Sequence, residues 1–132
     1  MNMEMSFLLL AFATVLAPLA QGQSPPPQPK ITGVLTILTP KPGATVEQIM
    51  KVMPAEIRAT VPLYLEGKIQ QWFTRGDGKG VIFLLNCTDV AEARALMETL
   101  PLSKENLMDE QFIPVGPLLP LGMLLRDSQT NK

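Results

Sequence analysis

Apolar residues recur with two different periods along residues 30–117, and the pattern predicts four strands and two helices. The strand-like segments are rich in β-branched and aromatic residues and cover residues 31–38, 68–75, 81–85 and 108–115. The helical segments begin after Thr45 and Asp89, each followed three residues later by the Gln or Glu of a capping box. The β-α-β-β-α-β order predicts an α+β, ferredoxin-like domain with an antiparallel four-stranded sheet and both helices on one face.

The first predicted helix has apolar residues at spacings of three and four, which indicates one buried face. These residues are Ile49, Met50, Met53, Ile57, Val61 and Tyr64. Pro54 predicts a kink or the start of a second segment, because proline removes a helical hydrogen bond. Gly67 is well placed to end the helix. The second helix should bury Val90, Ala93, Leu96, Met97 and Leu100 and end at Pro101.

Alternation along residues 68–75 assigns Ile69, Gln71, Phe73 and Arg75 to one face of the second strand. Residues 76–80 (GDGKG) predict a hairpin loop. A phosphate-binding loop is disfavoured there, because such a loop opens a helix and this one joins two strands. The unbroken apolar run of residues 81–85 predicts a central strand that is buried on both faces.

The segment before the domain has the pattern of an export signal. Residues 7–19 are almost wholly apolar, and Ala20-Gln21-Gly22 provides small residues for cleavage before Gln23. We therefore expect a signal peptide at residues 1–22, a Pro-rich linker at 23–29, and a periplasmic or extracellular protein. Because Glu4 is present and no Lys or Arg precedes the apolar run, a buried helix or a retained anchor is the alternative.

Composition and charge exclude several kinds of function. Without residues 1–22 the chain has 11 basic and 11 acidic residues and no basic stripe, so nucleic acid is a poor partner. The chain has no His and one cysteine, Cys87, which excludes the usual zinc sites and His-dependent nucleophilic catalysis. We expect no metal, no cofactor, and no membrane span once the signal is removed. Cys87 is interpreted as a buried core residue.

A sheet with helices on one face leaves its other face without cover, so a homodimer or a larger homo-oligomer is expected. Depending on strand register, its apolar area would come from Ile69, Phe73, Val81, Phe83 and Leu85. Residues 118–132 form an apolar C-terminal arm with a polar tail. An exposed apolar arm indicates packing on a neighbouring subunit, and the alternative is an arm folded over its own sheet.

Several motifs in this order resemble muconolactone isomerase, a small oligomeric enzyme of the dimeric α+β barrel superfamily. They are Leu65-Glu66-Gly67 before a strand, Trp72-Phe73 followed by Arg75, and Leu100-Pro101-Leu102 before Met108-Asp109. The similarity covers residues 54–117, roughly half of the chain. Residues 39–44 and 113–117 also resemble small proteins with muconolactone-isomerase-like domains. The resemblance implies dimers that pack sheet against sheet and a pocket between sheet and helices.

The implied chemistry is the cofactor-free, proton-transfer isomerisation of a small unsaturated lactone or acid. Because His is absent, the base must be a carboxylate, Lys or Tyr. Glu66 is the candidate base. The candidates for substrate binding are Arg75, which could bind a substrate carboxylate, Trp72, which could form a pocket wall, and Tyr64 beside Glu66. Glu66 and Arg75 should then face one cavity.

Each candidate also has a structural interpretation. Glu66 could be a solvated acid before a helix-ending glycine, Arg75 a charge at a strand end, and Trp72 a core or interface aromatic. Glu56 and Arg58 are interpreted as exposed helix charges. The alternative function is a non-catalytic, secreted module that binds a small ligand or supports oligomeric assembly.

Overall fold

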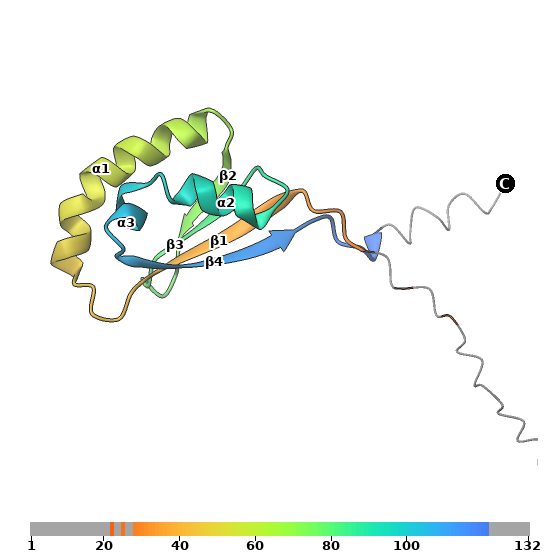
Figure 1. The fold of residues 1–132 in the computed structure, drawn as a ribbon, viewed down its shortest axis with the longest axis horizontal. Helices are drawn as coiled ribbons and strands as arrows, with labels where there is room; N and C mark the ends of the chain where they lie inside the picture. Colours follow the sequence, from red (N-terminus) through yellow and green to blue (C-terminus); the bar gives the residue numbers. More distant parts are fainter. Residues whose placement is uncertain (1–21, 23–24, 26–27, 122–132) are drawn as a thin grey trace, which may run out of the picture.

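The structure, a computed structural model, describes residues 22, 25 and 28–121 (Figure 1). Its elements, in order, are β1 (Gly33–Pro40), α1 (Val46–Leu65), β2 (Ile69–Thr74), β3 (Val81–Leu85), α2 (Val90–Met97), α3 (Pro101–Lys104) and β4 (Met108–Val115). The predicted α+β class is therefore confirmed. The predicted signal peptide, most of the linker and residues 122–132 lie outside the described residues. No helix among those described has the length and apolar character needed to cross a membrane.

The strands form one four-stranded sheet in the order β2-β3-β1-β4, and every neighbouring pair is antiparallel. The antiparallel sheet is thus confirmed, and its arrangement with the helices is compatible with a ferredoxin-like fold. Strands β2 and β4 lie at the edges. Pro114 is in edge strand β4, where its missing N–H removes fewer ladder bonds than it would in a central strand.

The hydrophobic core lies between the helices and one face of the sheet. Alternate residues of β1, Val34, Thr36 and Leu38, are buried. They meet buried residues of β3, α2 and α3, including Phe83, Leu85, Ala93, Met97 and Leu102. Burying one large aliphatic side chain contributes about 1.5–3 kcal/mol. This shared core therefore holds the helices against the sheet.

Helix α1 begins as predicted. The Thr45 hydroxyl accepts a hydrogen bond from the Gln48 amide at 3.2 Å, and the Gln48 side chain accepts one from the Thr45 amide at 2.9 Å. Pro54 does not divide the helix, which continues to Leu65 and curves along its length (Figure 1). Gly67 follows the helix with a φ of +75°, a conformation that glycine adopts without strain.

The buried side of α1 differs from the predicted one. Glu56 and Thr60 are buried, and Met53 is partly buried beside them. By contrast, Met50 is 58 % exposed and Ile57 is 54 % exposed. The interpretation of Glu56 as an exposed charge was therefore wrong, because the helix turns this carboxylate toward the sheet. Arg58 is exposed, as expected.

A β-bulge changes the faces of strand β2. Ile69 pairs with Leu85 and Gln71 pairs with Leu84, so one extra residue of β2 lies between two successive pairs. Because of this shift Ile69 faces the helices, whereas Phe73 faces away from them. The predicted sharing of one face by Ile69 and Phe73 was wrong.

The same register corrects the predicted apolar surface of the sheet. Ile69, Phe83 and Leu85 are buried beneath the helices, and Val81 packs against the same core. Of the five residues expected on the free face, Phe73 alone lies there.

The second half of the chain contains an element that was not predicted. Asp89 caps α2 by accepting a hydrogen bond from the Glu92 amide at 2.7 Å. Pro101 follows α2 and begins the short helix α3, with proline in the first turn. Strand β3 is central as predicted, but Ile82 and Leu84 on its other face are only half-buried.

The hairpin between β2 and β3 closes as predicted. The Arg75 amide donates to the Gly80 carbonyl at 2.9 Å. Gly80 has a φ of +125°, and a Cβ there would lie 1.9 Å from the Leu38 carbonyl oxygen. This close approach brings the hairpin against the end of β1, next to the cavity described below.

Candidate functional site

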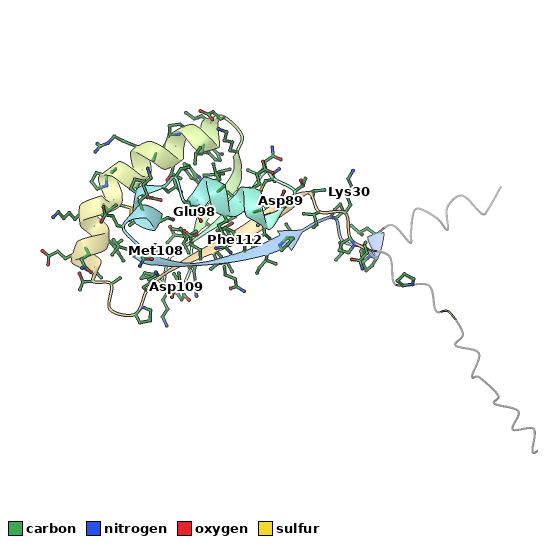
Figure 2. All side chains as sticks on the ribbon, in the orientation of Figure 1. Lys30, Asp89, Glu98, Met108, Asp109 and Phe112 are labelled. Atoms are coloured by element: carbon green, nitrogen blue, oxygen red, sulfur yellow. The ribbon has the colours of Figure 1, made fainter. Side chains whose placement is uncertain are left out.

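A cavity of about 430 Å³ lies between α1 and the helix-covered face of the sheet. Its walls are mainly apolar and include Leu38, Met53, Val81, Phe83, Leu102 and Met108. Figure 2 shows Met108 at one end of the sheet and Lys30 at the opposite end. The volume and the apolar lining are typical of a small-molecule site.

Among the described residues that line the cavity, Glu56 alone has an ionisable side chain, and its relative exposure is 6 %. Its Oε2 accepts a hydrogen bond from the Leu102 amide at 2.8 Å. Burial raises the pKa of the Glu56 carboxyl, and the nearby acid Glu110 adds to this rise. The Leu102 amide and the Thr60 hydroxyl lower the pKa, but the desolvation effect is larger. A buried acid with a perturbed pKa in a cavity marks a candidate site.

Glu56 also completes the start of helix α3. Leu100 occupies the N-cap position and has no side-chain oxygen to offer, and Pro101 has no N–H. The Leu102 amide is therefore the first donor of α3 that needs a partner, and the carboxylate from α1 supplies it. Ser103 donates a further hydrogen bond to Glu110 of β4. Two acids from different elements thus fix α3 beside the cavity.

The aromatic wall is formed by Trp72, which lines the cavity from β2. Tyr64 of α1 stacks on Trp72 with ring centroids 4.4 Å apart and an interplanar angle of 7°. The structure therefore places Trp72 where the predicted pocket wall would be. Tyr64 lies behind it as a support and does not line the cavity.

Glu66 and Arg75 do not line this cavity. Glu66 is the C-cap residue of α1 and pairs with Lys68 at 2.9 Å, and each side chain is 55 % exposed. Arg75 donates to the Thr39 hydroxyl at 3.0 Å and pairs with Asp77 at 2.5 Å. The structure thus does not bring the two predicted residues together here, and both have neighbours that fit their structural interpretations.

The hairpin has its own local charge arrangement. The pKa of Asp77 is lowered, first by the hydrogen bond from the Lys79 amide and then by Arg75. This stabilises the charged form of Asp77 within the turn. The Arg75 side chain is therefore held by the Asp77 carboxylate and the Thr39 hydroxyl, and it lies outside the cavity wall.

Glu56 is the site residue that sequence reasoning missed. A weaker signal was present, because Val52, Glu56, Ala59 and Leu63 also follow helical spacing and point to one side. The more apolar stripe containing Met50 and Ile57 concealed this pattern.

Comparison with protein-family models and with curated protein sequences finds no match for the chain. The cavity itself is therefore the basis for a functional inference.

Replacing Glu56 with Gln should change how stability depends on pH. Because the folded-state pKa of Glu56 is raised, the folded chain holds this proton more firmly than the unfolded chain. The stability that the raised pKa of Glu56 contributes to the folded chain is fully present below the ordinary carboxyl pKa. It is lost as pH rises through the pKa of Glu56 in the folded chain. Glu56→Gln keeps an oxygen for the Leu102 amide and has no proton to lose. We expect it to gain stability relative to the wild type as pH rises.

Urea unfolding over a series of pH values measures this difference. Glu98→Gln is the matched control, because Glu98 is exposed at the end of α2. Its unfolding free energy should follow the wild type. If the unfolding free energies of Glu56→Gln and the wild type change with pH in parallel, the raised pKa of Glu56 is contradicted.

Proposed function

We propose that the cavity between α1 and the sheet binds a small, largely apolar molecule. The observation that carries this proposal is a cavity of about 430 Å³ with mainly apolar walls and a single buried carboxyl, that of Glu56. Apolar walls supply most of the affinity of such sites, and a few polar groups set the orientation of the ligand. Glu56 is placed to act as the polar anchor.

The outer part of the cavity supports the same proposal. Ile57 and Val61 line it while remaining 54 % and 37 % exposed, so apolar surface extends from the cavity to solvent. Trp72 is 37 % exposed and backed by Tyr64. Exposed apolar surface of this kind is typical of binding sites.

Binding is expected to change the fluorescence of Trp72, because it is the single tryptophan of the chain and lines the cavity. Suitable probes are a tert-butylcyclohexyl methyl ketone and the carboxylate of the same shape, neither of which obscures tryptophan emission. Saturable binding of either probe, checked by calorimetry, supports the proposal. Val61→Phe, which adds bulk to the wall, should weaken binding by about tenfold or more, equivalent to about 1.4 kcal/mol.

The matched control is Leu65→Phe, on the same helix but 77 % exposed and outside the cavity wall. It should bind like the wild type. If neither probe binds, or if both variants bind equally, the proposed ligand cavity is wrong.

A second candidate function is proton-transfer isomerisation, and the raised pKa of Glu56 favours it. A general acid-base group works best when its pKa lies near the working pH. Ionised Glu56 would take a proton from the α carbon, which lies between the carbonyl and the β,γ double bond, and would then return it to the γ carbon, so that the double bond moves into conjugation with the carbonyl. This gives Glu56 the role that the sequence interpretation assigned to Glu66. We keep the resemblance to muconolactone isomerase as a proposal about reaction class.

The isomerase candidate is tested with a β,γ-unsaturated cyclic ketone, whose conversion to the conjugated ketone is followed by absorbance. Glu56→Gln should lower the rate by about a hundredfold or more, the lower range for losing a general base. Glu56→Asp should retain part of the rate. If the protein binds the ketone but does not convert it, the isomerase candidate fails and the proposal of ligand binding stands.

We also propose a homodimer or larger homo-oligomer that pairs through the free face of the sheet. That face bears apolar side chains that are half-buried or exposed in the single chain. They are Leu35, Ile37, Phe73, Ile82, Leu84 and Ile113. Two such faces can pack about 10 Å apart with their side chains interdigitated. The near-zero charge of the chain without residues 1–22 offers little repulsion between copies.

Light scattering should give a mass of at least twice that of one chain. Ile82→Glu should convert this species to a monomer, because Ile82 lies on the free face of central strand β3 and a buried unpaired charge is unfavourable. Met50→Glu is the control, since Met50 is 58 % exposed on α1. A monomeric wild type, or an unchanged mass for Ile82→Glu, would exclude pairing through this face.

The two ends of the chain add further proposals. Leu118 and Leu121 are 65 % and 55 % exposed after β4, so residues 116–121 do not cover the sheet of their own chain. Figure 1 shows this segment leading away from the domain. We propose that it packs on a neighbouring subunit. Export, inferred from residues 1–22, remains a proposal.

A further inference from the structure

The charge of the cavity narrows the class of ligand it can hold. Among the described residues in its wall, none has a basic side chain, and Glu56 has the single acid. Two basic side chains of β2 and its flanking residues are engaged outside the cavity wall: Lys68 pairs with Glu66, and Arg75 pairs with Asp77. An anion that entered would therefore lose its hydration without gaining an opposite charge, which is strongly unfavourable.

The groups that act on the Glu56 carboxyl include a second acid and no base. Strand β4 contributes the second acid, Glu110, which acts on Glu56 through its charge. Helix α3 contributes the Leu102 amide, and α1 itself contributes the Thr60 hydroxyl. The Thr60 hydroxyl donates its proton to the backbone carbonyl of Glu56 at 2.7 Å. No described group near Glu56 therefore offers a positive charge to a ligand.

We propose that the cavity selects uncharged molecules whose carbonyl or hydroxyl oxygen accepts a hydrogen bond from the protonated carboxyl of Glu56, and that it excludes carboxylates. This inference rests on the proposed ligand cavity and specifies its ligand. The proposed ligand is uncharged, so it differs from the carboxylate-bearing substrate that Arg75 was expected to bind.

The two oxygens of Glu56 have separate tasks in this arrangement. Oε2 accepts the Leu102 amide and keeps the side chain in place. Among the described residues no backbone amide donates to Oε1, so in this proposal Oε1 holds the proton and donates it to the ligand. The protonated acid is a hydrogen-bond donor, whereas the ionised acid can only accept. An oxygen that can only accept, such as that of a ketone, therefore needs the protonated form.

The test compares the tert-butylcyclohexyl methyl ketone with the matching carboxylate, which differs from it mainly in charge. At a pH where Glu56 is still protonated in the folded chain and the carboxylate probe is ionised, the ketone should bind to the wild type about tenfold or more tightly than the carboxylate. The affinity for the ketone should fall as pH rises through the raised pKa of Glu56, because the donor is lost. Trp72 fluorescence reports both titrations.

Glu56→Gln supplies a neutral amide with its own N–H donor at the same position. It should keep ketone binding, remove its pH dependence, and bring the affinity for the carboxylate close to that for the ketone. Glu98→Gln, an exposed acid on another helix, should behave like the wild type in all three respects.

The outcomes separate this inference from the proposed function. If the carboxylate binds as well as the ketone or better, the inference fails and the ligand cavity stands. If selectivity is the same in the wild type and in Glu56→Gln, Glu56 is not the selecting group and the inference also fails. If neither probe binds, the proposed cavity function itself fails. The pH profile of the wild type tests the inference even if Glu56→Gln does not fold.

Discussion

A hydrogen bond of 2.8 Å from the Leu102 amide to the Glu56 carboxylate joins helix α1 to the short helix α3. The two residues are 46 positions apart, so the bond is a tertiary contact that neither helix can form alone. It provides α3 with the cap that Leu100 and Pro101 cannot supply. It also fixes the one acid of the cavity against a wall that is otherwise apolar. The packing of α3 against α1 and the position of the acid in the cavity therefore depend on the same hydrogen bond.

This dual role involves opposing effects on stability. Burial disfavours the ionised form of Glu56, and the Leu102 amide favours it. Because burial has the larger effect, the side chain holds its proton more firmly than an exposed Glu does. An acid with a raised pKa is in this way retained inside the core. A buried acid is tolerated here because one of its oxygens has a backbone donor.

The two faces of the sheet have different surroundings. The face toward the helices holds the core and the cavity, whereas Ile37, Ile82 and Leu84 remain on the free face. The cavity lies at the end of the sheet near Met108, and the chain enters the domain near Lys30 at the other end (Figure 2). The proposed ligand cavity and the proposed pairing face therefore lie on separate parts of one small domain.

The sequence by itself determined the four strands and the two longer helices of this protein, whereas the short helix α3 was not predicted. The strands, the Thr45 and Asp89 caps, and the hairpin at residues 76–80 follow from local signals that act within a few residues. Only the tertiary structure decided which side chains face the cavity. The bulge in β2 placed Ile69 and Phe73 on opposite faces, since one extra residue shifts a period-two pattern. Glu56 turned inward because a donor 46 positions away compensates its burial, and no local pattern contains that partner.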